Sequence, residues 1–410
     1  MLKIMRIAFK NLYRQKRRTL LTVFIISFGV IAVLLFSAVA GSFKSMMVGQ
    51  ITDSMLGHIQ IHRKGYVESL DNMPLNLLID SKELDRVTKI LDEITSIDSY
   101  SFRILFGGML SDYRETTNIK LAALDPEMEK KVIPLLVGRI KQGEMLAAGE
   151  IVLPDLITRG LKLKLNNDVV IIANNADGSV NGQGFKVSGI IESAVGPSGK
   201  YGYIHIDDAK TILRMQNTEV SEIAIRLRNP GEIKKTITIL NKRLSALKGE
   251  DGKPLLEIHP WMKLTPFYNI ARMIDMMALF IKVILITIVL ISIMNVMIMA
   301  VFERVKEIGT MTAIGTPATK IKLLFIFEGL LLGIIGAISG TIVGSIIIFI
   351  VRALKFTVSF GRTDNILLRP YVELSEIILV AVIVIFISVI AVIQPAVKAS
   401  RLEPIDALRQ

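Results

Sequence analysis

Four long apolar runs place the strongest constraint on how this chain can fold. They are Thr19–Ala40, Met276–Phe302, Lys322–Val351 and Ile377–Val397. As a helix, each run is long enough to cross a hydrocarbon core about 30 Å thick. Hydrophobic residues make up 51% of the chain, which is more than a typical soluble domain of this length contains. The sequence therefore predicts a membrane protein with four transmembrane α-helices.

The segment between the first two runs has the composition of a globular domain. Short strand-like runs, such as Ile119–Leu124 and Val169–Ala173, alternate with helical patterns. The chain has no cysteine, so this domain must be stabilised by its own core. Loops are expected at Asn174–Gly184, Gly196–Gly202 and Lys248–Pro254. We expect a large α+β extracytoplasmic domain over residues 43–273, inserted between helices 1 and 2.

The basic N-terminal segment predicts how the helices are oriented. Residues 1–18 carry seven Lys or Arg and no acidic residue, and the positive-inside rule keeps such a flank in the cytoplasm. Four crossings then return the C-terminus to the cytoplasm. Ala38-Val39-Ala40 looks like a signal-peptide cleavage site, but the apolar run before it is too long for one. The expected order is a cytoplasmic segment 1–18, helix 19–42, the external domain, helix 274–302, a cytoplasmic coupling helix 303–319, helix 320–351, an external loop 352–376, helix 377–397 and a cytoplasmic tail 398–410.

A short charged helical pattern separates the second and third apolar runs. Val305, Ile308 and Met311 recur every third residue, and charged residues occupy the other faces. The pattern ends at Gly315-Thr316-Pro317, where glycine is a typical helix stop. An ordinary solvated loop is the alternative interpretation. A compact helix held between two membrane helices can instead pass a push from a cytoplasmic partner into the bilayer.

Four sequence motifs accompany these apolar runs. They are Glu303-Arg304-x-x-Glu307-Ile308-Gly309-x-x-x-Ala313-Ile314-Gly315, Phe327-Glu-Gly-Leu-Leu-Leu-Gly333, Pro395-Ala-Val-Lys-Ala-Ser-Arg-Leu-Glu-Pro404-Ile-Asp-Ala-Leu-Arg409 and Ala8-Phe-Lys-Asn-Leu-Tyr-Arg14-x-Lys-Arg-Arg18-Thr-Leu20. The four motifs resemble those of ABC-transporter permeases of the MacB/FtsX/LolC-LolE type. They occur in the family's order around the corresponding hydrophobic spans. The segment between the first two helices matches more loosely.

The resemblance implies a non-catalytic subunit of the inner membrane. Two copies of a separate ABC ATPase would bind ATP and Mg²⁺, and a second permease, identical or homologous, would complete a dimer. The external domain would have two subdomains. Its large size and the absence of a fused ATPase most resemble the LolC/LolE type, which implies release of lipoproteins and a periplasmic lipoprotein carrier as a further partner. The alternatives are a mechanotransmitting regulator of a periplasmic hydrolase or sensor, and MacB-like efflux of peptides or antibiotics through an adaptor.

The resemblance also implies two functional regions. The first couples to the ATPase, and its apolar stripe is expected to dock into a cleft of that subunit. Its residues are Glu303, Arg304, Val305, Glu307, Ile308, Gly309, Met311, Ala313, Ile314 and Gly315. The second is a substrate cavity open to the outer leaflet, where apolar and thioether side chains suit acyl chains. Its residues are Phe36, Phe43, Met46, Met47, Met273, Met276, Met277 and Phe280.

Small and polar residues inside the membrane runs predict helix packing. Gly329, Gly333, Gly336, Gly340 and Gly344 follow one side of the third helix, so another helix can approach its backbone closely. That neighbour could belong to this chain or to a second subunit. Asn295 is a polar residue in the second helix and is expected to hydrogen-bond to another helix.

Catalytic and nucleotide-binding patterns are missing from the sequence. Gly196–Lys200 and Gly249–Lys253 lack the spacing and the Ser/Thr of a phosphate-binding loop. His58 and His62 lie on one face of a strand without other ligands in a metal-binding pattern, so we expect neither a metal site nor a catalytic site. The net charge of +12 is explained largely by basic residues beside the membrane, where anionic lipid is the expected partner and nucleic acid is not.

Overall fold

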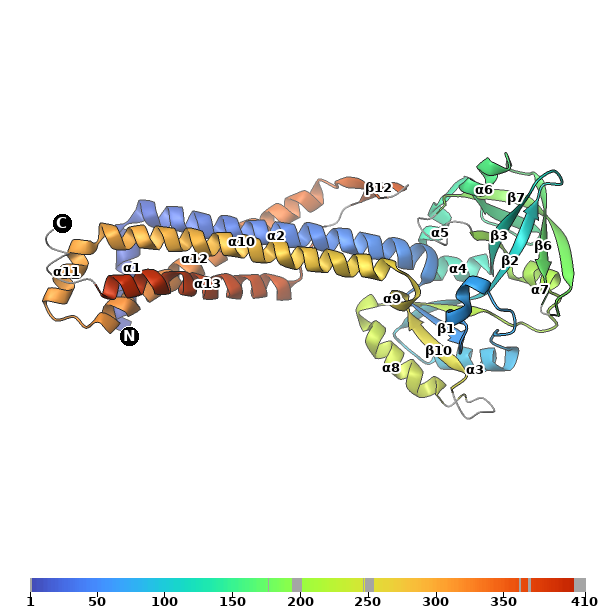
Figure 1. The fold of residues 1–410 in the computed structure, drawn as a ribbon, viewed down its shortest axis with the longest axis horizontal. Helices are drawn as coiled ribbons and strands as arrows, with labels where there is room; N and C mark the ends of the chain where they lie inside the picture. The colour runs from blue at the N-terminus through green and yellow to red at the C-terminus, as the bar shows by residue number, and fades with distance from the viewer. Residues whose placement is uncertain are drawn as a thin grey trace. The chain divides into compact units, whose positions relative to one another are not determined.

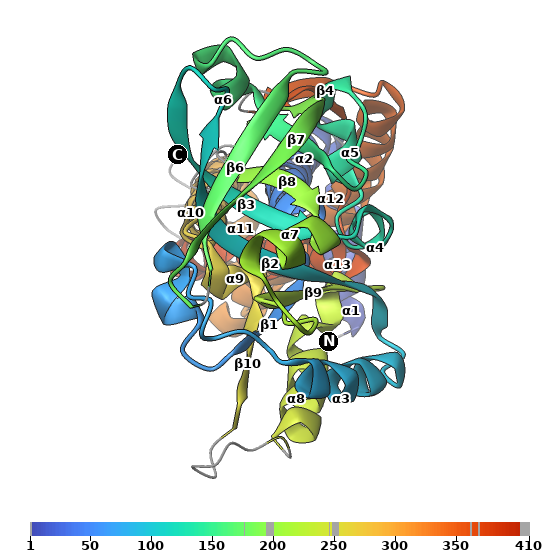
Figure 2. The same ribbon diagram turned by 90° about the vertical axis from the view of Figure 1, so that its right-hand side faces the viewer.

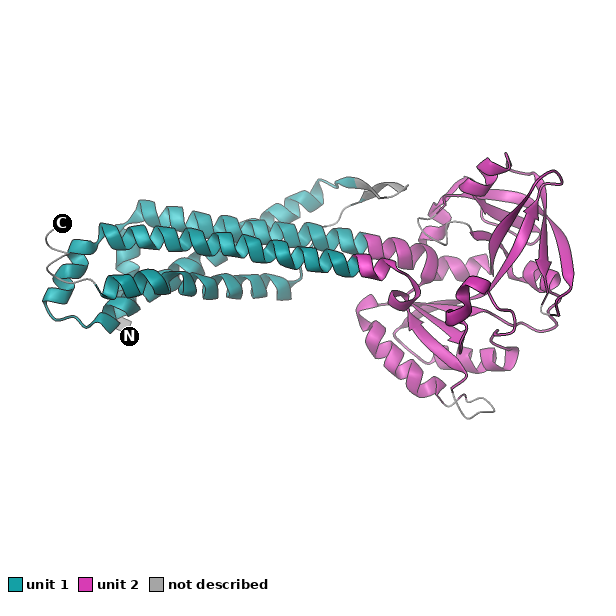
Figure 3. Ribbon diagram, viewed as in Figure 1, with its two compact units in different colours: residues 1–46, 271–358, 365–410 teal, residues 47–270, 359–364 magenta. Residues whose placement is uncertain are grey.

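A computed structural model describes residues 2–175, 177–193, 201–245, 247, 254–360, 363–367 and 370–401. The chain divides into two compact units (Figure 3). We call residues 1–46, 271–358 and 365–410 the helical unit, and residues 47–270 with 359–364 the sheet unit. Gly196–Lys200, Gly249–Lys253 and the end of the C-terminal motif, residues 402–410, lie outside the described residues.

The helical unit contains the four predicted spans. The helices are α1 (Leu2–Arg14), α2 (Lys16–Ile51, which continues into the sheet unit), α10 (Phe267–Glu303), α11 (Val305–Ala313), α12 (Ala318–Ala353) and α13 (Leu374–Ser400) (Figure 1). Within the described residues, four helical stretches are long and apolar enough to cross a membrane, at Lys16–Leu56, Phe267–Glu303, Ala318–Ala353 and Leu374–Ser400. They exceed the apolar runs because a helix continues beyond the residues that contact hydrocarbon.

Apolar side chains of the four spanning helices form one core in the helical unit. Buried examples are Val30 and Leu34 on α2, Ile293 on α10, Phe325 on α12 and Val392 on α13. A polar contact adds to this packing, since the Ser27 and Ser339 hydroxyls lie 2.6 Å apart. The short strands β11 (Thr357–Phe360) and β12 (Thr363–Leu367) pair with each other between α12 and α13 in the sequence.

The described strands of the sheet unit form a ten-stranded mixed sheet (Figure 2). Its order is β10-β1-β9-β2-β3-β8-β5-β7-β4, and β6 pairs with β2 and β7. The strands are β1 (Ile59–Arg63), β2 (Ile97–Ser111), β3 (Thr116–Leu124), β4 (Ile140–Gly143), β5 (Glu150–Pro154), β6 (Asp168–Asn174), β7 (Val180–Ile191), β8 (Tyr201–His205), β9 (Glu222–Leu227) and β10 (Leu256–Pro260). The division into two subdomains stays a prediction, because one sheet runs through the unit.

Helices cover parts of this sheet and close its core. They are α3 (Ser81–Asp92), α4 (Pro126–Val132), α5 (Leu135–Gly138), α6 (Asp155–Gly160), α7 (Ile206–Leu213), α8 (Ile233–Leu244) and α9 (Trp261–Leu264), with the shorter turns η1 (Thr52–Leu56), η2 (Val67–Asn72) and η4 (Pro230–Glu232). Apolar residues of α3, α7 and α8 join strand residues such as Ile61, Ile104 and Leu110 in one buried cluster. The α+β prediction is confirmed.

Two local expectations for the sheet unit were incomplete. Much of the expected loop Asn174–Gly184 is strand, because β6 and β7 pair from Asn174 opposite Val180. The first residues of β7 are exposed or half-buried and include two glycines, so the sequence shows no apolar strand pattern there. The sequence patterns also gave no strand at the position of β2, the longest of the described strands. A charged residue, Arg103, interrupts its apolar run, and the structure buries that arginine between two carboxylates.

Candidate coupling and substrate-facing sites

The helix α11 is the centre of the first candidate site. It begins at Val305, with only Arg304 between it and the end of α10, and ends at Ala313. Gly315 follows with φ of 87°, a left-handed conformation that glycine adopts without a steric penalty. The glycine stop predicted from the sequence is therefore present. Pro317 precedes the first residue of α12, so α11 is a separate short helix between two spanning helices.

The apolar stripe of α11 is buried inside the helical unit, which corrects its expected role. Ile308 is 1% exposed and belongs to the core of the spanning helices, Val305 is buried, and Met311 packs against that core. The stripe cannot dock into another subunit while it holds α11 on its own bundle. The core of the spanning helices covers this stripe.

The opposite side of α11 and its two ends are exposed. Among the predicted coupling residues, Glu303, Glu307, Ala313, Ile314 and Gly315 are exposed, whereas Arg304 and Gly309 are buried. Ile314 is 77% exposed, although it is a large apolar side chain at a helix end. Lys306 and Thr310, which the motif comparison did not select, are exposed beside them. This surface is available to a partner.

A buried ion pair anchors α11 to α12. The guanidinium of Arg304 donates to Oε1 of Glu328 over 2.9 Å, and both side chains are buried. The side-chain amide of Asn11 on α1 donates to the same oxygen over 2.8 Å. Arg18, at the start of α2, lies 3.9 Å from Oε2 of Glu328. Three helices and the turn between α10 and α11 thus meet at one carboxylate.

Three of the four sequence motifs supply this cluster. Arg304 comes from the coupling motif, Glu328 from the Phe327–Gly333 motif, and Asn11 and Arg18 from the N-terminal motif. Sequence reasoning missed Glu328 as a functional residue. The sequence does contain an indication of its role. Glu328 is a single acidic residue within a long apolar stretch, and an acidic residue in such a stretch is rarely left without a partner.

Charge pairs of the exposed surface extend from the buried cluster. Glu307 lies 3.6 Å from Arg14 and 3.7 Å from Arg304, and Glu303 lies 3.8 Å from Arg18. Such half-exposed pairs contribute little stability. The buried pair is different, because a displacement of α11 must carry Glu328 and α12 with it or leave a charge without its partner. The geometry therefore makes α11 mechanically continuous with a spanning helix.

The predicted substrate-facing residues fall into two groups. Met273, Met276, Met277 and Phe280 of α10 are exposed, half or more of each side chain. On α2, Phe36 and Met46 are half-buried and Phe43 is at the margin of exposure. Met47 is 2% exposed, so its inclusion in an open cavity was wrong. Its side chain fills a packed site, which a count of methionines along the sequence cannot reveal.

Ion pairs fix the helices at the level of these residues. The ammonium of Lys44 on α2 donates to the carboxylate of Asp275 on α10 over 2.6 and 2.8 Å. Lys282 on α10 donates to Glu376 on α13 over 2.6 Å. The exposed apolar side chains of α10 therefore stand on a helix that is held to two neighbours.

The glycines of α12 lie against two other helices of the same chain. A Cβ at Gly329 or Gly333 would overlap Val392 or Ser388 of α13, and one at Gly336, Gly340 or Gly344 would crowd Ile26, Val30 or Leu34 of α2. Asn295 is placed differently. It is exposed on α10, and no side-chain hydrogen bond is found for it among the described residues.

Metal and catalytic residues are not assembled in the described part of the chain. There, no three His, Asp or Glu side chains are placed to hold a metal ion. His62 contacts Glu222, with Nε2 3.4 Å from Oε2, and Nδ1 of His58 accepts from the backbone N–H of Leu227 over 2.9 Å. Both histidines are buried within the sheet unit.

Comparisons with known proteins agree with this architecture. Residues 19–242 match the model of the MacB-like periplasmic core domain, and residues 279–404 match that of the FtsX-like permease C-terminal region. The chain is 22% identical to the lipoprotein-releasing system transmembrane protein LolC of Neisseria meningitidis serogroup B, over 95% of this chain and 94% of that protein. LolC of Haemophilus influenzae is 24% identical over 66% of this chain and 67% of its own.

Solved structures give weaker likenesses. The periplasmic region of MacB from Actinobacillus actinomycetemcomitans is 15% identical, with a TM-score of 0.36, over 51% of this chain and 92% of that one. The fold and the family matches together define an inner-membrane ABC transporter permease, of the kind that works with an ATPase subunit. The chain belongs to the family of the MacB-like periplasmic core domain and carries an FtsX-like C-terminal region. The resemblance predicted from the four motifs is confirmed.

Proposed function

We propose that this permease releases lipoproteins from the inner membrane, using ATP hydrolysis by a separate subunit. The observation that carries the proposal is its end-to-end similarity to a LolC protein, which covers 95% of this chain and 94% of the relative. A shared spanning segment alone would not distinguish among ABC permeases. An alignment that also includes the large domain between the first and second helices supports a shared task.

The cytoplasmic side of this machine is the exposed surface of α11. Two ATPase copies bind ATP and Mg²⁺ and press on Ile314 and the charged residues beside it as they close. Because Arg304 ties α11 to Glu328, the push passes into α12. Both termini lie in the cytoplasm in this arrangement, and residues 43–273 are extracytoplasmic. A second permease, identical or homologous, completes the complex and covers exposed faces of the spanning helices.

The cargo is received at the outer leaflet. Met273, Met276, Met277 and Phe280 present flexible thioether and aromatic side chains outward on α10, and such side chains adapt to irregular apolar ligands. Each methylene of an acyl chain holds a lipoprotein in the bilayer by about 0.8 kcal/mol. Extraction therefore needs an external source of free energy. A periplasmic lipoprotein carrier then accepts the released protein.

Site-specific photocrosslinking tests this assignment in cells. A photoreactive amino acid at Met277 should capture an acylated protein, identified by mass spectrometry. Met299 is a matched control, since it is an exposed methionine of the same helix near its opposite end. It should capture lipid or a second subunit. If Met277 also captures only lipid or a subunit, in both ATPase-arrested and cycling complexes, the chain does not handle lipoproteins there.

A further inference from the structure

The N-terminal helix α1 is set at an angle to the spanning helices. Only Gln15 separates it from α2. The Thr19 hydroxyl on α2 donates to the backbone oxygen of Leu12 on α1 over 2.8 Å, although residues seven apart would be about 10 Å apart along a continuous helix. The chain therefore bends between the two helices, and α1 runs across the direction of α2 at one end of the helical unit (Figure 1).

One side of α1 is fixed against the other helices of its unit. Ala8 and Leu12, one turn apart, are buried, and α1 packs on α12. The side-chain amide of Asn11 also donates to Glu328 of α12 over 2.8 Å. These contacts fix the rotation of α1 about its own axis, so its remaining sides point in defined directions.

The exposed sides of α1 carry one apolar and one basic stripe. Both stripes repeat every four residues; the apolar one consists of Met5, Phe9 and Tyr13, and the basic one of Arg6, Lys10 and Arg14. All of these residues are exposed. We call the two sets the Phe9 stripe and the Lys10 stripe. Since each residue turns an α-helix by about 100°, the two stripes lie on neighbouring sides of α1.

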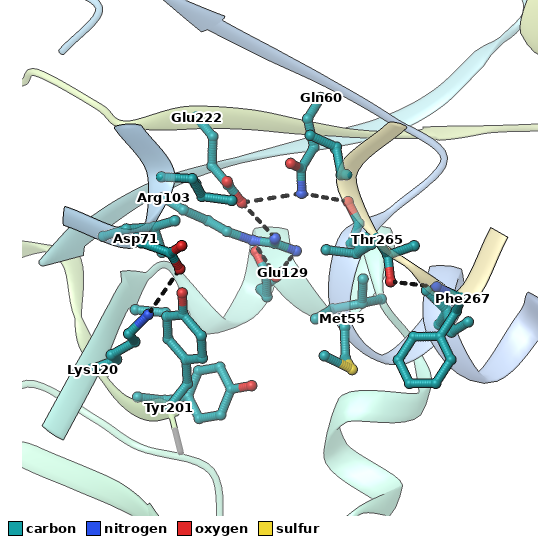
Figure 4. A pocket seen from close by; sticks show the side chains of 18 of the residues that line it. Met55, Gln60, Asp71, Arg103, Lys120, Glu129, Tyr201, Glu222, Thr265 and Phe267 are labelled. Atoms are coloured by element: carbon teal, nitrogen blue, oxygen red, sulfur yellow. Dashed lines mark hydrogen bonds and ion pairs between the residues drawn. The ribbon is translucent and has the colours of Figure 1, made fainter. Parts of the chain in front are cut away.

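The positive charge of the Lys10 stripe is not neutralised within the described part of the chain. Arg6 and Lys10 form no ion pair there. Charges that the fold uses internally are paired, as beside the cavity of the sheet unit in Figure 4, where Arg103 donates to both Glu129 and Glu222. The basic side of α1 is therefore available to an anionic partner outside this chain.

The Phe9 stripe leads into an exposed apolar side of α2. On α2, Lys16, Leu20, Phe24 and Phe28 repeat every four residues and are all exposed. The ammonium of Lys16 lies 4.6 Å from the centre of the Tyr13 ring on α1. An exposed apolar side of a spanning helix faces the membrane interior, which a soluble protein cannot cover. The partner of the Phe9 stripe is therefore sought at the membrane surface.

We propose that α1 binds the surface of a bilayer that contains anionic phospholipid. The Phe9 stripe is inserted at the boundary between headgroups and acyl chains, and the Lys10 stripe binds the phosphates. Helices with basic residues on one side and large apolar residues on another bind membranes in this way, and each Lys or Arg near an anionic surface strengthens the binding. A merely solvated helix side accounts for the charges, but not for three large apolar side chains exposed beside them. The proposal does not depend on lipoprotein release.

Two single thiols on α1 provide the test, because the chain contains no cysteine. Phe9→Cys and Ile7→Cys replace apolar residues that are 58% and 51% exposed, but the two positions lie about 160° apart around the helix. Each full-length variant carries a fluorophore on its thiol and is reconstituted in phosphatidylcholine nanodiscs. A lipid with a nitroxide at the top of its acyl chain should quench the fluorophore at position 9 and leave the one at position 7 largely unquenched.

The charge of the lipid is tested by placing the nitroxide on phosphatidylglycerol or on phosphatidylcholine. For Phe9→Cys, half-maximal quenching should need an about fivefold lower mole fraction of the labelled phosphatidylglycerol. Adding Arg6→Gln and Lys10→Gln should abolish this preference and leave the unfolding temperature unchanged, because neither side chain has a partner among the described residues.

Three results would overturn the proposal. Quenching at neither position shows that the Phe9 stripe does not contact lipid, and equal quenching at both shows that no particular side of α1 does. Equal quenching of Phe9→Cys by the two lipids shows that α1 does not select anionic lipid, whether or not the Gln variant inserts. A preference for phosphatidylglycerol that survives in the Gln variant removes the Lys10 stripe as its cause and also overturns the proposal.

Discussion

At the scale of single residues, the buried carboxylate of Glu328 is central to the helical unit. Its carboxylate is fully buried and depends on Arg304 and Asn11 for its hydrogen bonds. A charge taken out of water is tolerated when its partners are in place, and breaking one side of a buried pair is strongly destabilising. The stability of the helical unit and the force transmission that we propose for α11 therefore rest on the same contact.

Glu328→Gln should destabilise the protein by about 3–5 kcal/mol, because the charge of Arg304 then loses its buried carboxylate partner and keeps only the longer contact to the half-exposed Glu307. Thermal unfolding of the purified protein measures this loss. Glu303→Gln is the matched control, since Glu303 is exposed and makes only a long contact to Arg18. It should unfold close to the parent. Equal unfolding temperatures for the two variants would show that the buried pair does not hold α11 on α12.

The buried carboxylate of Glu222 should make the sheet unit sensitive to acid. Burial opposes its ionisation, but the hydrogen bond with His62 and the charge of Arg103 outweigh this and lower the pKa of Glu222 below 4.5. Stability from this group is therefore present above pH 4.5 and is lost as pH falls through the lower folded-state value. Glu222→Gln should be less stable at pH 7 and lose less stability on acidification, as followed by circular dichroism. A steeper acid loss in the variant would contradict this sign.

The same residues show which contacts could not be predicted from the sequence. Arg103 interrupts an apolar run, so a pattern of alternation could not detect β2. Its two carboxylate partners lie 26 and 119 residues away along the chain. Likewise, Glu328 and Asn11 are 317 residues apart. Charge and spacing identify a residue that needs a partner, but only the fold determines which partner it meets.

At the scale of elements, the spanning helices were predictable and their faces only partly so. Apolar length alone indicates a membrane helix, and the glycine spacing of α12 indicated a close approach. The stripe of α11 was also visible, but periodicity does not say whether a neighbouring helix or another protein covers it. The structure places Ile308 in the core of the helical unit. The exposed residues that a partner could contact, such as Ile314, lie outside the apolar spacing of this motif.

Gly340→Leu should disrupt the contact between α12 and α2. A Cβ at this position would lie 2.7 Å from Cβ of Val30 and 2.8 Å from the carbonyl oxygen of Ser27, so the helices must separate. Overpacking of this kind costs about 1–3 kcal/mol. Gly41→Leu is the control, because a Cβ there meets no atom within 4 Å. Thermal stability in detergent should fall for the first variant alone; a parent-like Gly340→Leu would mean that the two helices do not pack there.

At the scale of the whole molecule, the proposed function requires that α11 transmits a push and stays packed on the helical unit. Ile314→Asp places a charge on the exposed end of this helix, outside the buried stripe. The protein should fold and insert normally, but its ATPase partner should bind more weakly and lose its stimulation. Val180→Asp, an equally simple change at an exposed residue of the sheet unit, should leave ATPase activity unchanged. Copurification and phosphate release measure both effects, and normal stimulation of Ile314→Asp would exclude this surface as the contact.

The most direct test of lipoprotein release is reconstitution of the complete complex. Permease, its ATPase and a fluorescent acylated protein are placed in proteoliposomes, and the acylated protein that leaves the membrane is measured after ATP is added. We expect ATP-dependent release by the parent and none by Ile314→Asp, although that variant should insert normally. ATP hydrolysis stimulated by the parent permease, with all of the acylated protein retained in the membrane, would contradict lipoprotein release.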